Sequence, residues 1–317
     1  MKAVLGLDTS CYTTSCALAD TEGHVIDQRR RLLSVDAGER GLMQSEMVFQ
    51  HVNRLPVLVE ELMAAHPEAE IAAVCASTRP RPVADSYMPV FTVSEGFGRS
   101  IAAVHHVPFV ASTHQEGHIR AAMVDTGLKP GCNMLALHLS GGTTELLHVK
   151  DGTLTLVGGS NDLHAGQFVD RVGVALGLGF PCGPALEELA VKGSAKALLP
   201  TWVHDCDCSF SGSESAAQRM IEKGELTKED MAAEVYSCIE RTLCKLILNA
   251  AEKTDTYRIL IAGGVASSKL LRSLLTERMK KRNRNMKVFF GRPELSGDNA
   301  CGVALIGSEE LGVRSEE

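Results

Sequence analysis

Two strand–turn–strand units, one opening each half of the chain, constrain the fold most. In the first, the apolar run 4–8 meets a polar turn and a second strand-like run, 15–19, follows. In the second, the run 134–139 precedes a polar turn at 140–144, and 146–149 returns. Each unit has the pattern of a hairpin whose turn presents hydroxyls and backbone N–H groups, and their recurrence predicts a duplicated architecture. Two unrelated hairpins would produce the same pattern.

Helical and strand-like patterns alternate along the rest of the chain. The helical segments are 47–65, 95–105, 166–178, one from 184, 228–253, one ending near 282 and one starting near 298. The strand-like segments are 71–76, 109–111, 258–262 and 288–290. This alternation predicts an α/β fold.

The length favours two lobes over a single small domain. A chain of 317 residues corresponds to roughly two domains or one bilobed unit. No stretch is long enough to act as a linker between independent domains. We therefore expect an N-terminal lobe at 1–128 and a C-terminal lobe at 129–317, arranged around one cleft, with the final helix packing back.

Composition excludes several classes of protein. Apolar residues make up 44% of the chain, which is ordinary for a globular protein, and no run of about 18 apolar residues predicts a membrane span. An aspartate as early as Asp8, with no cleavage-site pattern, argues against a secretory signal. We expect a cytoplasmic protein whose ten cysteines act mostly as small core residues. Cys206 and Cys208 are the nearest pair, and their spacing is a weak metal signal.

The segment from Thr113 to His118 carries the sharpest chemical signal. Thr113 and Glu116 have the spacing of a helix capping box. His114 and His118 then lie one helical turn apart on the same face, where two imidazoles can reach one metal ion. Two inert histidines at a helix end are the alternative. Metalloproteases of the H-E-x-x-H type need a glutamate where this chain has Gln115, so proteolysis is disfavoured.

A third metal ligand must come from elsewhere in the chain. Asp298 lies at a predicted strand-to-helix junction, where active-site carboxylates are common. Two histidines and a carboxylate suit one divalent ion, Fe or Zn. From the local sequence, a helix N-cap is the competing interpretation of Asp298.

Glycine-rich turns are the candidate phosphate-binding elements. Ser140-Gly141-Gly142 and Ala262-Gly263-Gly264 each follow an apolar strand, and Gly183 precedes a helix. Glycine lets backbone N–H groups approach an anion, and a helix N-terminus favours its charge. None of these turns is a P-loop. Asp170 could accept a hydrogen bond from a ribose hydroxyl, or be a solvated helix residue.

The net charge of −7 disfavours a protein that coats nucleic acid. One local run, 278–284, is strongly basic. Such a run is either a solvated helix end or a contact with RNA.

In their order and spacing, these motifs resemble the tRNA N6-adenosine threonylcarbamoyltransferase family, formerly named a glycoprotease family. The matching motifs are 5–11 (L-G-L-D-T-S-C), 114–118 (H-Q-E-G-H), 139–144 (L-S-G-G-T-T), 166–170 with 181–184 (P-C-G-P), 210–212 (F-S-G), 262–265 (A-G-G-V) and 292–299. The resemblance covers nearly the whole chain.

The resemblance implies a fold and an activity. The fold would be the actin-like, sugar-kinase-like (ASKHA) α/β fold of two duplicated RNase H-like lobes around a nucleotide cleft. The activity would be transfer of a threonylcarbamoyl group from threonylcarbamoyl-AMP to N6 of the adenosine beside the tRNA anticodon. Partners would be tRNA and helper proteins of the pathway, including a paralogous RNase H-like dimer partner, with no membrane.

The resemblance also assigns residues. His114, His118 and Asp298 would hold the metal, and Asp8 and Ser140 would be catalytic. An adenine nucleotide, threonylcarbamoyl-AMP or ATP, would bind the following residues: Ser140, Gly141, Gly142, Thr143, Thr144, Asp170, Gly183, Gly263, Gly264 and Ser268.

Several positions depart from the family pattern. The family's glycine-rich loop after residue 76 is replaced by Thr78-Arg79-Pro80-Arg81-Pro82, a family lysine by Glu214 and a family asparagine by Ser268. Paired aspartates are reduced to Asp162. A divergent bacterial paralogue is therefore the alternative: a carbamoyl-type transferase acting on another acceptor, or a nucleotide-binding partner of the true enzyme.

Overall fold

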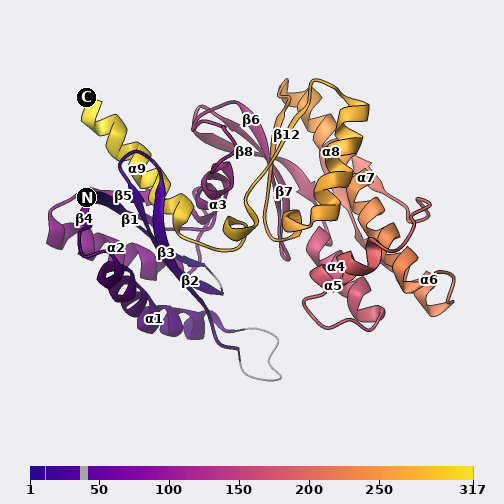
Figure 1. The fold of residues 1–317 in the computed structure, drawn as a ribbon, viewed down its shortest axis with the longest axis horizontal. Helices are drawn as coiled ribbons and strands as arrows, with labels where there is room; N and C mark the ends of the chain where they lie inside the picture. The colour runs from indigo at the N-terminus through magenta and orange to yellow at the C-terminus, as the bar shows by residue number, and fades with distance from the viewer. Residues whose placement is uncertain (11, 36–41, 317) are drawn as a thin grey trace. The chain divides into compact units, whose positions relative to one another are not determined.

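The computed structural model describes residues 1–10, 12–35 and 42–316, with side chains described as far as 312. Cys11, part of the first motif, lies outside these ranges. The chain divides into two compact units (Figure 1): Met1–Ala122 with Gly297–Glu317, and Met123–Ser296. This division differs from the expected ranges 1–128 and 129–317, because the C-terminal segment belongs to the first unit.

The first unit is built on a five-stranded sheet. Its strands are β1 (Lys2–Ser10), β2 (Thr13–Asp20), β3 (Val25–Leu32), β4 (Glu70–Ser77) and β5 (Phe109–Ser112), in the order β3-β2-β1-β4-β5. The hairpin β1–β2 and its neighbour β3 are antiparallel, whereas β4 and β5 continue parallel to β1. The predicted first hairpin is therefore confirmed.

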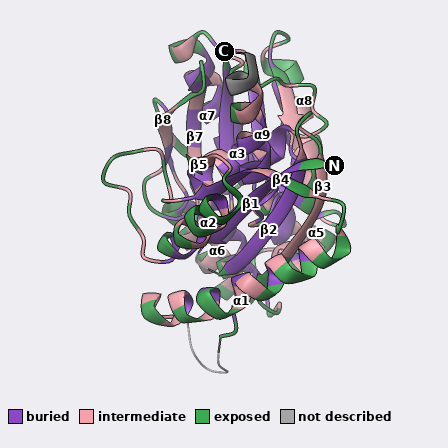
Figure 2. Cartoon of the chain, turned by 90° about the vertical axis from the view of Figure 1, so that its left-hand side faces the viewer, coloured by how far each residue is buried: buried purple, intermediate pink, exposed green. Residues whose placement is uncertain are grey.

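Helices cover both faces of this sheet. Helices α1 (Gln44–Ala65) and α2 (Phe91–His105) lie on one face, and α9 (Cys301–Glu316) lies on the other (Figure 1). β1 and β2 are accordingly almost wholly buried (Figure 2), with Leu5 and Leu7 in one cluster with Leu55 of α1. On the α9 face, a Cβ on Gly6 would lie 2.5 Å from the Ala304 nitrogen. This close approach explains why the C-terminal helix belongs to the first unit.

The second unit repeats the same topology in a seven-stranded sheet. The strands are β6 (Met134–Leu139), β7 (Thr144–Lys150), β8 (Thr153–Ser160), β9 (Trp202–His204), β10 (Asp207–Ser209), β11 (Arg258–Ala262) and β12 (Lys287–Phe290). Their order is β12-β11-β6-β7-β8-β10-β9. The run β8-β7-β6-β11-β12 reproduces β3-β2-β1-β4-β5, with the same antiparallel and parallel pairings. The duplication predicted from the two hairpins is confirmed.

Helices pack around the second sheet, and glycine-containing turns follow the ends of β6 and β11. They are α4 (Ala165–Ala175), α5 (Gly183–Ala190), α6 (Ser211–Glu222), α7 (Lys228–Thr254) and α8 (Lys269–Arg282), with short 3₁₀ turns at Val265–Ser267 and Pro293–Leu295. Leu243 and Ile247 of α7 are fully buried in one cluster with Ile259 of β11. Within the described ranges, every helix is too short or too polar to cross a membrane.

Candidate metal centre and nucleotide loops

Helix α3 (His114–Met123) begins where the sequence predicts, because a capping box fixes its first turn. The Glu116 nitrogen donates to Thr113 Oγ1 over 3.2 Å, and the Thr113 nitrogen donates to a Glu116 carboxylate oxygen over 2.8 Å. The first helical residue is His114. The two histidines therefore project from the first turn and the turn that follows it.

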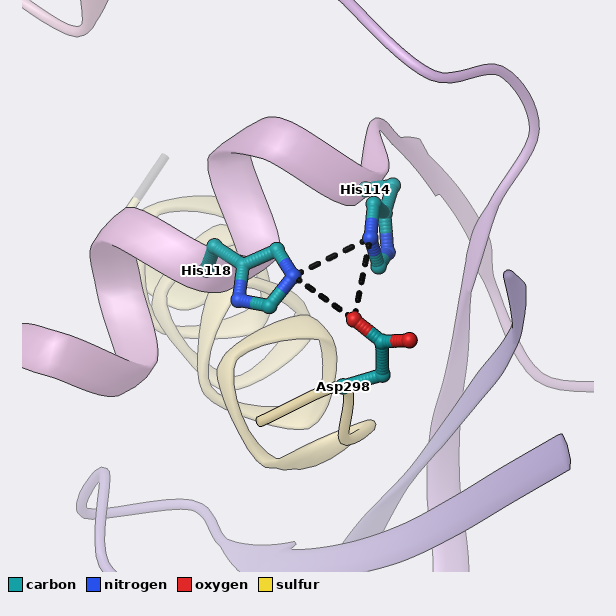
Figure 3. A group of neighbouring side chains, drawn as sticks. All are labelled: His114, His118 and Asp298. Atoms are coloured by element: carbon teal, nitrogen blue, oxygen red, sulfur yellow. Dashed lines mark hydrogen bonds and ion pairs between the residues drawn. The ribbon is translucent and has the colours of Figure 1, made fainter. Parts of the chain in front are cut away.

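Both imidazoles meet Asp298, which precedes α9 (Figure 3). The Nε2 atoms of His114 and His118 lie 3.0 Å apart, and Asp298 Oδ1 lies 3.6 Å from the first and 3.2 Å from the second. Asp298 is not the cap of α9: the Cys301 nitrogen donates to Asn299 Oδ1 over 3.0 Å. The Asp298 carboxylate faces the histidines, as a ligand would.

Two glycines allow this convergence. Helices α3 and α9 cross where Gly117 meets Gly302, and a Cβ on Gly302 would lie 1.8 Å from the Gly117 carbonyl oxygen. A Cβ on Gly117 would lie 2.9 Å from Val303 Cγ2. Because Gly117 lies between the two histidines, the close crossing holds both of them beside the residues that lead into α9.

Asp8 contacts the His114 nitrogen that does not face Asp298. Its Oδ1 lies 3.0 Å from His114 Nδ1 and accepts a hydrogen bond from Ser77 Oγ over 2.5 Å. An imidazole that donates its Nδ1 proton to a carboxylate presents the Nε2 lone pair on its other side. Asp8 is fully buried, and its Oδ2 atom has no hydrogen-bond partner among the described residues. A buried carboxylate of this kind is stabilised by positive charge on the imidazole side.

The charges of the carboxylates and imidazoles at this site shift one another's pKa values. Burial opposes the charged imidazolium, but the carboxylates of Asp8 and Asp298 outweigh it and raise the pKa of His114 to about 9. Burial also opposes the Asp298 carboxylate, yet the hydrogen bond from His118 and the charge of His114 hold the pKa of Asp298 well below its usual range. Thr13 Oγ1 donates to the other Asp298 oxygen over 3.2 Å.

This donor set fits a divalent transition metal. One ligand atom from each of His114, His118 and Asp298 lies within 4.8 Å of the others, so a single ion can contact all three. Two imidazoles and one carboxylate, with His114 held from behind by Asp8, match the chemistry of Zn and Fe sites that keep open positions.

In the second unit, the turn after β6 has the open backbone that an anion requires. The Ser140 nitrogen donates to the Thr143 carbonyl over 2.9 Å, which closes the turn. Gly141 and Gly142 are exposed, and a Cβ on either would meet nothing within 4 Å. Thr144 differs from its neighbours, because it is fully buried and its Oγ1 accepts a hydrogen bond from the Ala165 nitrogen. It positions the start of α4 and does not face solvent.

Helix α4 brings Asp170 close to this turn. Gly166 packs against the turn, since a Cβ there would lie 2.7 Å from Gly141 Cα. Asp170 Oδ1 accepts a hydrogen bond from the Cys182 nitrogen over 2.8 Å, which ties α4 to the residue before α5. Asp170 and Gly141 line one cavity of about 690 Å³, together with Glu214. Gly183, the first residue of α5, accepts a hydrogen bond from Tyr236 Oη through its carbonyl.

The turn after β11 lies beside the turn after β6. Gly263 has a φ of +103°, and a Cβ there would lie 2.2 Å from the Leu139 carbonyl oxygen. Gly264 is exposed beside it. Ser268 Oγ accepts a hydrogen bond from the Leu271 nitrogen over 3.1 Å and caps α8. The structure thus brings Ser140, Gly141, Gly142 and Gly263 to neighbouring strand ends and places Asp170 of α4 on the cavity that Gly141 lines, while Ser268 has a structural partner of its own.

Asp162 is the centre of a hydrogen-bond network that the sequence analysis did not predict. Its carboxylate accepts hydrogen bonds from the hydroxyls of Ser209 and Ser211 and from the Leu163 and Phe210 nitrogens. Burial would raise the pKa of Asp162, but these hydrogen bonds lower it well below its usual range. Asp162 therefore anchors the F-S-G segment to the start of α4. Its only sequence signal is its place beside the 166–170 motif.

Arg278 of the basic run and the cysteine pair have structural roles, whereas Lys280, Lys281, Arg282 and Arg284 of that run are exposed. Arg278 of the basic run forms an ion pair with Glu240, which is 2% exposed. Cys206 and Cys208 are buried in the core of the second unit, and burial raises the pKa of both thiols, that of Cys208 to about 12. Among the described residues, neither cysteine belongs to a group that could hold a metal.

Comparison with known sequences identifies a family. A family model described as tRNA N6-adenosine threonylcarbamoyltransferase matches residues 36–305. A protein of Crocosphaera subtropica with the same name is 32% identical to this chain over 337 residues, covering 98% of this chain and 93% of that protein.

Comparison with solved structures identifies the fold. HypF from T. kodakarensis matches with a TM-score of 0.63 and 12% identity, covering 99% of this chain and 48% of that one. A ROK family glucokinase from Streptomyces griseus matches with a TM-score of 0.55 and 12% identity, covering 97% and 99% of the two chains. At these identities the likeness concerns the fold alone, and it confirms the sugar-kinase-like architecture of two RNase H-like lobes.

Proposed function

This chain belongs to the tRNA N6-adenosine threonylcarbamoyltransferase family, and from that premise we propose that it carries out the family reaction with one bound divalent metal, Fe or Zn. It is a transferase. The group transferred is threonylcarbamoyl, the donor is threonylcarbamoyl-AMP, and the acceptor is N6 of the adenosine beside the tRNA anticodon. The convergence of His114, His118 and Asp298, three residues from two distant parts of the chain, is the observation that carries the proposal.

In this reaction the N6 amine attacks the carbamoyl carbon of the donor, the bond from that carbon to the AMP oxygen breaks so that AMP leaves, and N6 releases a proton to solvent. A metal ion held by His114, His118 and Asp298 would supply Lewis-acid chemistry for the carbamoyl or threonyl oxygens. Asp8 acts on His114 as a positioning residue: it fixes the tautomer and the ring orientation, so that Nε2 faces Asp298. Thr13 orients the carboxylate of Asp298 through its second oxygen.

The glycine turns of the second unit are assigned to the nucleotide part of the donor. The exposed backbone at Gly141 and Gly142 suits a phosphate, because N–H groups without neighbouring side chains can donate to its oxygens. Ser140 adds a hydroxyl to that turn, and Thr143 closes it. Asp170, on the cavity that Gly141 also lines, suits the ribose hydroxyls.

We place the protein in the cytoplasm with tRNA, pathway helper proteins and a paralogous RNase H-like partner. Two alternatives keep the same metal centre. One is a paralogue with another acceptor, for which Glu214 in the cavity beside Asp170 is the supporting observation. The other is a nucleotide-binding partner of a true enzyme. A partner of that kind would not need two histidines of which one, His114, is held by Asp8.

The test is direct transfer. Threonylcarbamoyl-AMP is generated in place by a partner synthase from threonine, bicarbonate and ATP, and unmodified tRNA that decodes ANN codons is added with the helper proteins. The digested tRNA is then analysed by mass spectrometry. We expect threonylcarbamoyladenosine with the wild type and none with His114→Ala. Metal-loaded wild type that leaves the tRNA unmodified would refute the proposed acceptor and favour the paralogue.

A further inference from the structure

The segment between β4 and α2 is fastened to the metal-binding helix at both of its ends. At its start, the Arg79 carbonyl accepts a hydrogen bond from the His114 nitrogen, and the Pro80 carbonyl accepts one from the Gln115 nitrogen, each over 3.0 Å. Just after its end, the ring of Phe91 lies 5.8 Å from the ring of His114. Arg79 therefore lies beside the first turn of α3, and Tyr87 belongs to the same segment, four residues before Phe91.

This segment is stiff and carries exposed recognition groups. Prolines at 80, 82 and 89 restrict its backbone. Tyr87 is 69% exposed, and Arg79 is also exposed. Arg79 forms no ion pair with any residue in the described ranges. A stiff segment loses little conformational entropy when it binds, so its exposed side chains are preorganised for contact.

A second unpaired guanidinium flanks the centre from β3. Arg30 Nη1 would lie 3.3 Å from a Cβ on Gly297, the residue before Asp298. The two neighbours of Arg30 on the strand are neutralised, Arg29 by Asp27 and Arg31 by Glu61. Arg30 itself has no such partner in the part of the chain that the structure describes. Free positive charge is thus found on both segments that adjoin the ligands.

We propose that Arg30, Arg79 and Tyr87, here called the RNA collar, bind the RNA strand that carries the acceptor adenosine and hold it at the metal centre. The inference rests on the proposed function and names the residues that would recognise its substrate. Arginine neutralises and hydrogen-bonds phosphate groups, and an exposed tyrosine ring stacks on an unpaired base. Because the whole chain carries a charge of −7, attraction of RNA must come from local cations of this kind.

The arginines are tested by binding of unmodified tRNA at several salt concentrations. The variant Arg30→Gln with Arg79→Gln is compared with Arg31→Gln, which changes the adjacent, neutralised arginine of β3. We expect the double variant to bind about tenfold more weakly, with a salt dependence reduced by about 1.4, since each lost contact to single-stranded RNA removes about 0.7. Arg31→Gln should match the wild type.

The tyrosine is tested by a matched pair. Tyr87→Phe keeps the ring and should bind tRNA as the wild type does, whereas Tyr87→Ala should lose about tenfold, as expected for one stacked base. Metal content and melting temperature should be unchanged in every collar variant. That result would separate loss of RNA contact from damage to the metal centre.

The outcomes distinguish the inference from the proposed function. Collar variants that bind tRNA with wild-type affinity and salt dependence overturn the inference, even when wild type and variants all make the modified nucleoside. A wild type that binds no tRNA also overturns it, as does a double variant that loses only binding of a helper protein. A wild type that binds tRNA through the collar but leaves it unmodified refutes the proposed reaction and supports the collar.

Discussion

Replacing Gly302 by alanine should weaken metal binding without altering any ligand. The new Cβ would lie 1.8 Å from the Gly117 carbonyl oxygen and 2.7 Å from the Ala121 nitrogen, both of them backbone atoms. Real Cβ atoms stay at least 3.0 Å from such neighbours, so α9 must withdraw from α3 by about 1.2 Å. Metal–ligand distances tolerate only about 0.2 Å.

The displacement acts on the site because the two histidines lie on α3, whereas Asp298 lies on the short segment that leads into α9. Asp298 lies four positions before Gly302. We expect Gly302→Ala to weaken metal binding by at least about tenfold, comparable to loss of an outer-shell partner, and to lower the free energy of unfolding by about 1–3 kcal/mol through overpacking.

The matched control is Gly312→Ala. It places the same substitution in the same helix, at a position where a Cβ meets nothing within 4 Å. Its metal affinity should equal that of the wild type, and its stability should rise by about 0.4–1 kcal/mol, because alanine favours helix. Chelator competition and urea unfolding measure the two quantities. A Gly302→Ala protein that resembles Gly312→Ala in both would refute the crossing argument.

Three further predictions follow from single contacts. Asp8→Asn should keep the fold but lower metal affinity about 10- to 100-fold, measured by chelator competition, because His114 loses its carboxylate partner. Gly263→Ala should cost about 1–3 kcal/mol in urea unfolding, since it combines a φ of +103° with a contact of 2.2 Å to the Leu139 carbonyl; a loss below about 0.5 kcal/mol would contradict this reading. Because the pKa of Asp162 is lowered in the folded state, its carboxylate stabilises the fold above about pH 4, and this contribution is lost as the pH falls further. In Asp162→Asn, the free energy of unfolding should therefore fall less steeply between about pH 4 and 2. An equally steep fall in the variant and the wild type would count against this prediction.

Local patterns predicted the parts of the site that depend on neighbours in sequence. The i, i+4 spacing placed His114 and His118 on one face, and the capping box fixed the start of α3, because both depend only on helix geometry. The two strand–turn–strand units predicted the duplicated topology. The edge strand β3 was missed, since its partly exposed D-Q-R-R-R segment lacks the alternation of a half-buried strand.

Contacts between distant segments could not be predicted from local patterns. The pairing of Asp8 with His114 and the crossing of Gly117 with Gly302 arise only when β1, α3 and α9 pack together. For Asp298, the local sequence left cap and ligand open, and the bond from Cys301 to Asn299 assigns the cap elsewhere. The two serine hydroxyls that donate to Asp162, those of Ser209 and Ser211, lie more than 40 positions away, which explains why sequence reasoning saw only a departure from the family pattern.

The metal-to-protein ratio of the purified chain tests the central claim most directly. Elemental mass spectrometry should find about one Fe or Zn ion per wild-type chain, and less than about a tenth of an ion in His114→Ala, His118→Ala and Asp298→Ala, each of which should remain folded. Arg31→Gln, which touches none of the ligands, should retain the full complement. Equal metal in wild type and all three ligand variants, or none in a wild type that still transfers the threonylcarbamoyl group, would contradict the account.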